Sequence, residues 1–408
     1  MALDARRLRY GMVGGGVGAF IGDVHRRAIA LDDSAELVAG CFSRDPQKNA
    51  STGLAWRVPD ERVYRDFESM AAGEAVRDDA IDFVVIVSPN DTHHRIAKTF
   101  LGHGIHVACD KPLTTTVADA DELVARAAKQ GRKILVTYPN VGYPIVKHAR
   151  QMIAAGEIGR VRMVMAEYPQ GWQAPGAVES NPVVTDRSQL RWRMNPETQG
   201  PSGSVGDIGT HAENLVSYVT GLEVESVSAS LQAFGPNAVI DNNATINARL
   251  SGDAIGHFWT SQIAIGYRNA LRIRVVGEKG TIEWCGETPD LLGFTQLGGP
   301  TMTLSKGSSD LHPLAQAFRR IPPGHPEGTY EGFSNIYRAF VADLRFCAGV
   351  PAPGALAAAG AREPDSNLEE LVRNDYPTGS EAARSVRFIH AAVESSAANA
   401  RWVRLAEV

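Results

Sequence analysis

A glycine-rich break in an apolar segment near the N-terminus constrains the fold more than any other feature of this chain. The sequence YGMVGGGVGAFIGDVH over residues 10–25 continues the apolar run Leu8–Val13, which is short enough for a buried strand. Three consecutive glycines then allow a sharp turn because they carry no Cβ, and a helix is predicted to begin near Phe20. Free N–H groups at such a helix start attract a pyrophosphate. The segment therefore predicts a dinucleotide-binding loop.

The spacing of the glycines fits two versions of the dinucleotide fingerprint. Gly14, Gly16 and Gly22 make a loop longer than the compact form, whereas Gly14, Gly16 and Ala19 fit G-x-G-x-x-A. The second strand is predicted at Glu36–Phe42, and the residues after it lie where a side chain would contact the adenine ribose. From these segments we predict cofactor contacts by Gly14, Gly16, Ala19, Phe20, Ile21, Ser43 and Arg44.

The residues after the second strand leave the choice between NAD and NADP open. NAD preference usually needs an acidic group that binds both ribose hydroxyls, whereas Ser43 and Arg44 could hold the 2′-phosphate of NADP. Asp45 lies one residue further along and keeps NAD in consideration.

Length and composition limit the classes of protein to which the chain can belong. At 408 residues the chain exceeds what one hydrophobic core usually serves, so we expect two domains, residues 1–140 and residues 141–408. The 41 Lys and Arg against 46 Asp and Glu argue against a nucleic-acid partner. An apolar run long enough for a membrane span and an N-terminal signal core are both missing from the sequence, so we expect no membrane partner and a cytoplasmic location. The four cysteines are scattered, which predicts neither a metal site nor a disulfide framework.

Two further strand ends are predicted to face the glycine loop. The apolar run Ile81–Val87 suits a strand buried on both faces of a parallel sheet, and the next strand is Ile105–Cys109. Ligands collect at the carboxyl ends of such strands. A lysine there could hold a substrate hydroxyl and ease proton loss, although a lone lysine is more often a solvated surface group. Further cofactor contacts are therefore predicted for Ser88, Pro89, Asn90, His93, Asp110 and Lys111.

The second half of the chain changes to strands separated by turns. This pattern predicts an α+β domain with a mostly antiparallel open sheet, and an Ala-, Gly- and Pro-rich stretch within residues 350–376 is expected to be a flexible excursion. The most informative segment is Trp192–Leu215, where Asp207 and His211 lie four residues apart at a predicted helix start. Such residues share a helix face, so the aspartate could fix the histidine tautomer or bind a substrate hydroxyl directly. An N-cap aspartate beside an unrelated packed histidine is the alternative.

The ordered motifs GMVGGGVGAFIG, VSPNDTHH, CDKP and GDIGTH resemble the glucose-fructose oxidoreductase and inositol dehydrogenase family over nearly the full chain. The resemblance implies an α/β Rossmann dinucleotide-binding domain followed by the α+β domain. It also implies that Lys111 is catalytic, often with a cis bond to Pro112, and that Asp207 and His211 are catalytic and contact substrate. The resemblance further implies a homo-oligomer, a dimer or a tetramer, that buries the outer face of the second sheet.

Four other motifs, ARQMIAAGEIGRVR, WRMNPETQGPSG, RVVGEKGTIEW and GHPEG, resemble dehydrogenases that oxidise the C3 hydroxyl of glucosides. This subgroup implies a sugar or glycoside substrate and points to NAD. Inositol oxidation is one alternative, and a non-catalytic protein that binds the cofactor and regulates is another. Additional substrate contacts are predicted for Asn140, Tyr143, Trp172, Arg193 and His325, of which the last follows from the subgroup resemblance.

Overall fold

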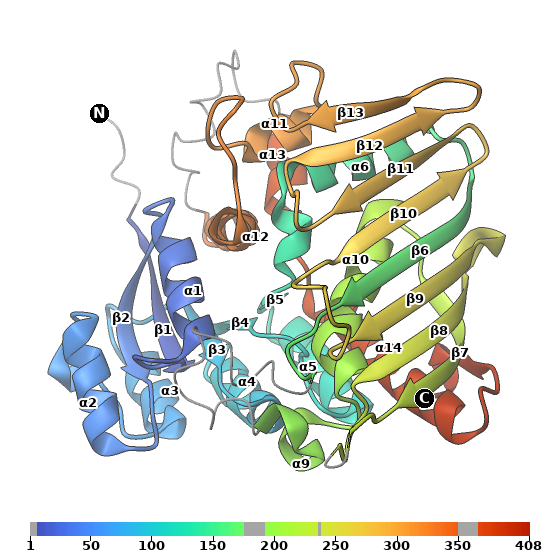
Figure 1. The fold of residues 1–408 in the computed structure, drawn as a ribbon. Coiled ribbons are helices and arrows are strands. Elements are labelled where there is room, and N and C mark those ends of the chain that lie inside the picture. Colours follow the sequence, from blue (N-terminus) through green and yellow to red (C-terminus); the bar gives the residue numbers. More distant parts are fainter. Residues whose placement is uncertain (1–5, 175–191, 236–237, 350–365) are drawn as a thin grey trace.

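Two sheets, one parallel and one mostly antiparallel, organise the molecule (Figure 1). The computed structural model describes residues 6–174, 192–235, 238–349 and 366–408. The five-stranded parallel sheet has the order β2-β1-β3-β4-β5, and the nine-stranded sheet has the order β13-β12-β11-β10-β6-β9-β8-β7-β14. The predicted fold class, a Rossmann dinucleotide-binding domain followed by an α+β domain, is confirmed.

The parallel sheet is built from short apolar strands joined by helices. Strand β3 is buried along its whole length, as predicted for a central strand covered on both faces. Asp45, Asp66 and Thr116 each accept a hydrogen bond from a backbone N–H at the start of a helix. The elements are β1 (Leu8–Gly14), α1 (Phe20–Ala30), β2 (Ala35–Cys41), α2 (Pro46–Ala55), α3 (Phe67–Ala75), β3 (Phe83–Val87), α4 (His93–Gly102), β4 (His106–Cys109), α5 (Val117–Lys129) and β5 (Ile134–Val136).

In the second sheet, buried and exposed residues alternate along the strands. In β8 (Asn243–Leu250) every second residue is buried, which is typical of a sheet with one covered and one open face. Among the strands that the structure describes in this sheet, β6 and β9 pair in parallel and the other neighbours are antiparallel. The remaining strands are β6 (Val161–Pro169), β7 (Val224–Gln232), β9 (Ile255–Ser261), β10 (Arg272–Gly277), β11 (Gly280–Cys285), β12 (Leu291–Gln296), β13 (Thr301–Ser305) and β14 (Val403–Arg404).

Helices cover one face of the second sheet. Buried residues of α6 (Pro144–Ala154), α10 (Thr210–Thr220) and α14 (Gly379–Ala397) share one apolar cluster with residues of β6 to β12. Three shorter helices are α9 (Pro196–Gln199), α11 (Pro313–Phe318) and α13 (Ser366–Arg373). Among the helices of the described residues, none has the length and apolarity that crossing a bilayer requires. The cytoplasmic location stays a prediction.

Two helices from the C-terminal part of the chain complete the cover of the parallel sheet. Helix α12 (Thr329–Cys347) packs beside α1, and the hydroxyl of Tyr337 lies 2.6 Å from Nδ1 of His25 (Figure 1). On the other face, Ala382 and Val386 of α14 join the apolar cluster of β4 and α5. The predicted domain boundary at residue 140 stays a prediction, because helices from beyond that boundary also pack against the first sheet.

The segment expected to be a flexible excursion is partly ordered. Residues 350–365 lie outside the described residues, whereas Ser366–Arg373 forms α13 and Asp375 is buried. The prediction was wrong for residues 366–376. The physical reason is an ion pair: the carboxylate of Asp375 accepts hydrogen bonds from Lys147, from Nη1 of Arg150 at 2.8 Å and from the hydroxyl of Tyr218 at 2.9 Å.

We predict that Lys147→Met destabilises the protein far more than loss of an exposed ion pair. Lys147 and Asp375 are 0% and 1% exposed, so the variant removes one partner of a buried pair and should lower the free energy of unfolding by about 3 kcal/mol. The control is Arg274→Ala, which removes a half-exposed pair with Glu283 and should cost about 1 kcal/mol or less. Urea unfolding followed by tryptophan fluorescence measures both, and equal losses would contradict the prediction.

Candidate active site

Lysine and aspartate side chains from the two halves of the chain meet in a partly buried ion pair. Lys111 follows β4, and Asp207 lies in the π-helical turn Val205–Gly209 that leads into α10. The Nζ atom of Lys111 donates to Oδ1 of Asp207 at 2.7 Å and also to the backbone carbonyl of Asp207. The two side chains are 15% and 16% exposed. The structure therefore brings together two of the three predicted catalytic residues.

The loop that carries Lys111 is fixed by its neighbours. The peptide bond between Lys111 and Pro112 is cis, as the resemblance implied. Oδ1 of Asp110 accepts hydrogen bonds from the backbone N–H of Lys111 at 2.9 Å and from the hydroxyl of Thr137 at 3.0 Å. These contacts hold the ends of β4 and β5 together and set the direction of the lysine backbone.

Two residues that the sequence analysis missed position Asp207. The carboxylate of Asp241 accepts from the backbone N–H groups of Gly203 and Ser204, both at 2.9 Å, just before the π-helical turn. The buried Gln262 donates from Nε2 to Oδ2 of Asp207 at 2.8 Å. Neither residue has a local sequence signal, because each lies far from Asp207 in the chain.

His211 lies one helical turn beyond Asp207, among aromatic rings. The imidazole packs edge-on against Tyr138 and Tyr168, with ring centroids 5.4 Å and 5.9 Å apart. Its Nδ1 atom lies 3.4 Å from the side-chain amide of Asn140. Tyr138 follows the end of β5, so the strand-end rule that identified Lys111 could also have found it.

The sequence-based idea that Asp207 fixes the tautomer of His211 does not match the observed pairing. The two carboxylate oxygens of Asp207 accept from Lys111 and Gln262, and the amide of Asn140 is the hydrogen-bonding group beside Nδ1 of His211. The physical reason is the π-helical turn at Val205–Gly209, which replaces the α-helical start assumed for the shared face.

The charges at this site favour a neutral imidazole beside a carboxylate. Burial and then the positive charge of Lys111 lower the pKa of His211 to about 3, and Asp207 and Asp110 only partly offset them. Burial opposes ionisation of Asp207, but Lys111 and Arg193 outweigh it and lower the pKa of that carboxyl to about 2. At neutral pH the histidine can therefore accept a proton.

The glycine loop has the close backbone contacts of a dinucleotide cradle. A Cβ at Gly14 would lie 2.8 Å from the backbone oxygen of Val87, and a Cβ at Gly22 would lie 2.0 Å from the backbone oxygen of Gly15. Gly22 therefore serves the close packing between helix and loop, which the fingerprint assigns to its third glycine. Helix α1 begins after Ala19 without a side-chain cap, so its first N–H groups suit a pyrophosphate.

The residues after β2 lack a free carboxylate at the expected ribose position. Ser43 is half-buried and Arg44 is exposed. Asp45 accepts hydrogen bonds from the backbone N–H groups of Gln47 and Lys48, so its carboxylate caps α2. Contacts of Ser43 and Arg44 with the cofactor stay predictions.

The predicted cofactor residues after β3 are largely occupied by internal hydrogen bonds. The ring nitrogens of the buried His93 face the backbone oxygens of Pro112 at 2.8 Å and Ser88 at 2.9 Å, so this side chain joins two loops instead of facing the cradle. Asn90 donates to the backbone oxygen of Gln199 at 3.0 Å. Direct cofactor contacts in this segment, including those of Pro89, stay predictions.

The predicted substrate residues separate into two groups. Asn140 lies beside His211, and Nε of Arg193 lies 4.0 Å from Oδ1 of Asp207. Trp172 precedes Gln173, whose backbone N–H and side-chain amide both donate to Gln262.

The other two predicted substrate residues pack elsewhere. The buried ring of Tyr143 packs on Trp284 with centroids 5.7 Å apart. His325 lies exposed in the loop before α12, which Glu327 anchors by accepting from Lys306 at 2.6 Å. The structure does not bring His325 into contact with the catalytic group.

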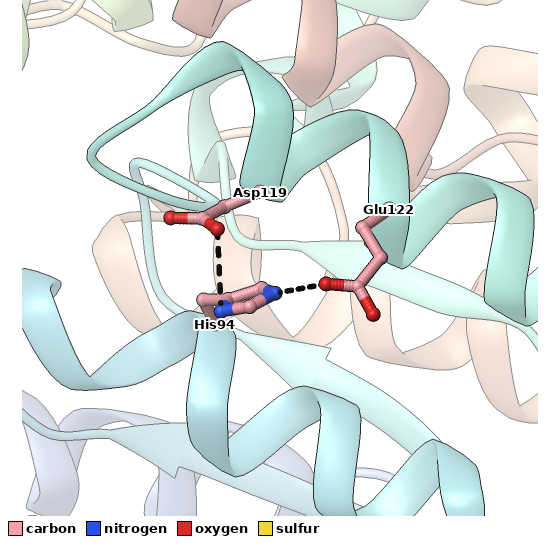
Figure 2. Close-up of side chains that lie close together, drawn as sticks. All are labelled: His94, Asp119 and Glu122. Atoms are coloured by element: carbon pink, nitrogen blue, oxygen red, sulfur yellow. Dashed lines mark hydrogen bonds and ion pairs between the residues drawn. The ribbon is translucent and has the colours of Figure 1, made fainter.

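A second polar cluster lies on the helices of the first sheet. Figure 2 shows His94 of α4 between Asp119 and Glu122 of α5, at 3.4 Å and 2.9 Å. Glu122 also pairs with Lys98 and Arg126 at 2.8 Å and 3.1 Å. Because Lys98 and Arg126 already balance the charge of Glu122, the cluster holds α4 and α5 together.

Both halves of the chain match models of known protein families. Residues 8–138 match the model of an oxidoreductase family with an NAD-binding Rossmann fold, and residues 146–283 match the model of the GFO/IDH/MocA C-terminal domain. The uncharacterized oxidoreductase YfiI of Bacillus subtilis is 33% identical over 402 residues, which cover 98% of this chain and 97% of that protein.

Relatives with named substrates are also similar. An inositol dehydrogenase homolog of Azotobacter vinelandii, solved with NAD⁺, is 33% identical with a TM-score of 0.87 over 98% of both chains. Its structure with NADH and myo-inositol is 34% identical with a TM-score of 0.85. The D-glucoside 3-dehydrogenase of Escherichia coli is 29% identical over 57% of this chain and 60% of that protein.

We predict that Gly22→Ala weakens dinucleotide binding. The added Cβ would collide with the backbone of Gly15, and a strain of about 1–3 kcal/mol corresponds to a loss of affinity of about tenfold or more. Gly102→Ala is the control, since a Cβ at that helix position meets nothing within 4 Å. Titration with NADH, followed by its fluorescence, measures both variants. Wild-type affinity in Gly22→Ala would contradict the assigned role of this glycine.

Proposed function

Because this chain belongs to the GFO/IDH/MocA family of oxidoreductases and has an NAD-binding Rossmann domain, we propose that it oxidises the C3 hydroxyl of a glucoside. The observation that carries the proposal is the convergence of Lys111 and Asp207 beside His211, at the carboxyl end of the parallel sheet. A cation and a neutral imidazole are the two groups that loss of a hydride and a proton from a secondary alcohol requires.

The neutral imidazole of His211 accepts the hydroxyl proton, and the ammonium of Lys111 stabilises the negative charge that develops on the oxygen. A bound nicotinamide would supply the acceptor for the hydride that leaves the same carbon. The products are a ketone, a reduced nicotinamide and a protonated histidine. Asp207 positions Lys111 through the 2.7 Å ion pair and partly balances the imidazolium.

The side chains around the catalytic group suit a polyhydroxylated ring. Arg193 lies 4.0 Å from Asp207 and stacks over Trp192, with its guanidinium carbon 4.6 Å from the ring centroid. Trp172, beside the Gln173 and Gln262 contacts, adds a second indole in this part of the molecule. Indole rings pack on the apolar faces of sugars while guanidinium and amide groups bind the hydroxyls. The name of the D-glucoside 3-dehydrogenase relative supports a glucoside.

Inositol oxidation is the second candidate. It is favoured by the similarity to the A. vinelandii homolog solved with NADH and myo-inositol. A cyclitol and a pyranose offer the same ring of secondary hydroxyls, so the proposed roles of Lys111 and His211 apply to both. A third candidate, a regulator that binds the cofactor without turnover, is disfavoured because Lys111, Asp207 and His211 are all retained in one group.

We also propose that the chain forms a homo-oligomer, a dimer or a tetramer, through the open face of the nine-stranded sheet. On this face Met163, Met165 and Ile255 are 38%, 41% and 51% exposed on the paired strands β6 and β9. A row of exposed apolar side chains on paired strands favours an interface.

The function is tested by measuring NADH formation with a panel of glucosides and inositols. We expect turnover of glucosides, and a fall in kcat of about 10²–10⁴-fold in Lys111→Met and in His211→Ala, since each loses a group that acts in the transition state. Lys129→Met, an exposed lysine of α5, is the matched control and should keep full activity. Preference for inositols would support the second candidate. Wild-type turnover in both variants would refute the assigned roles.

The pH dependence of kcat/KM provides a separate prediction. Because the pKa of His211 is lowered to about 3 from 6.5, the imidazole stays neutral well below pH 6.5, and the acid limb of the profile should lie below that value. Lys111→Met removes a charge that lowers this pKa, so its acid limb should move up. His103→Ala, which removes an exposed histidine, should leave the limb in place. A wild-type acid limb at or above pH 6.5 would contradict the prediction.

A further inference from the structure

A cavity of about 680 Å³ lies away from the catalytic group, at the edge of the nine-stranded sheet near the C-terminus. It is bounded by β7, β8, α14 and the residues from Arg404 to Ala406. In Figure 1 this region is the lower right of the molecule, where β7, α14 and the C-terminus lie together. The cavity shares no residue with the Lys111, Asp207 and His211 group, and its volume lies within the range of small-molecule sites.

The lining of this cavity is rich in arginine. Four arginines line it, Arg249 of β8, Arg384 and Arg387 of α14, and Arg404 of β14, against two glutamates, Glu223 and Glu225. These arginines come from three separate elements. Four arginines against two glutamates give the lining an excess of positive charge, which favours an anionic ligand.

The partners of these arginines leave many donors unused. Arg384 pairs with Glu223 at 3.4 Å, Arg387 with Asp121 at 2.6 Å, and Arg404 with Glu407 at 3.3 Å. Arg249 stacks over Trp402, with its guanidinium carbon 4.7 Å from the ring centroid. Each guanidinium has five N–H donors in a planar fork, which matches the oxygens of a phosphate.

Two of the four arginines have restricted positions. Arg384 and Arg387 are 35% and 26% exposed. Both project from α14, which contacts the chain near Lys111 and near His211. In α14, the ring of His390 faces the backbone oxygen of Thr115 at 3.0 Å, and Ser385 donates to Glu213 of α10. The arginines are thus held on a rigid element, which lowers the entropic cost of binding an anion.

We propose that this cavity binds a small phosphate-bearing molecule. Its phosphate lies among the guanidinium groups of Arg249, Arg384 and Arg404, and the remaining volume accommodates the rest of the ligand. The cavity is large for inorganic phosphate alone, so a phosphate ester or a pyrophosphate fits it better. The proposal is independent of the proposed oxidation, because the two sites have no residue in common.

The test measures the thermal stability of the full-length protein with sodium pyrophosphate, with inorganic phosphate, and with sodium chloride at the same ionic strength. Both phosphates should raise Tm above the chloride value, and pyrophosphate should act at the lower concentration. Arg249→Ala with Arg404→Ala should weaken the apparent Kd about tenfold or more, because charge-assisted hydrogen bonds are lost. Both side chains lie at the surface, so the double variant should fold.

Three controls separate this cavity from other sites. Arg401→Ala removes an exposed arginine of the same C-terminal segment that does not line the cavity, and should leave the shift unchanged. Gly22→Ala weakens the dinucleotide cradle, which itself suits a pyrophosphate, so the part of the shift that remains in this variant belongs to the cavity. Glu225→Gln removes an exposed carboxylate from the lining and should tighten binding. The proposal is overturned if phosphate and pyrophosphate do not stabilise the wild type beyond chloride, or if the double variant responds as the wild type does.

Discussion

The ion pair between Lys111 and Asp207 is the interaction on which the rest of the site depends. A charged pair with side chains about one-sixth exposed is stable only with good geometry and further hydrogen bonds. Here the loop of Lys111 is held by Asp110 and Thr137, and the turn of Asp207 is held by Asp241 and Gln262. The pair therefore joins the end of the parallel sheet to the start of α10. Its lysine lowers the pKa of His211, and its aspartate partly offsets that effect.

The C-terminal helices make this junction rigid. Helix α12 packs against α1 and β3, where Phe340 meets Phe83 with ring centroids 5.5 Å apart. Helix α14 covers the opposite face. Its His390 contacts Thr115 in the loop after Lys111, and its Ser385 contacts Glu213 in the helix of His211. The parallel sheet is thus partly covered by helices that follow β13 in the chain. Because the C-terminal part of the chain packs back on earlier segments, breaking the buried pair of Lys147 and Asp375 should lower the stability of the whole molecule.

Much of the first domain could be predicted from local patterns. The glycine loop, the buried strand Phe83–Val87 and the Thr116 cap are local signals, and each one is observed. Helices α2 and α3 were not predicted, and strands β11 to β13 were also missed, although Phe67, Met70 and Ala71 give α3 the spacing of a buried helix face. The order of the sheet depends on contacts between distant segments, which periodicity does not encode.

The candidate site also combines residues with a local sequence signal and residues that only long-range contacts bring together. Lys111 could be found because it ends a strand, whereas Gln262 and Tyr168 reach the site only through the pairing of β6 with β9. His93 has the residue type and position expected for a cofactor contact, yet its ring holds two loops together. Residue type alone therefore does not distinguish a binding residue from a structural one. The hydrogen-bond partners of the side chain are needed to assign its role.

The most direct measurement is a crystal structure of the protein with NAD and a glucoside. We predict that one secondary carbon of the sugar, C3, lies against the nicotinamide ring, and that its hydroxyl oxygen lies within hydrogen-bond distance of both Nζ of Lys111 and the imidazole of His211. A sugar bound with that oxygen away from either group, or a dinucleotide bound away from the glycine loop, would contradict the account.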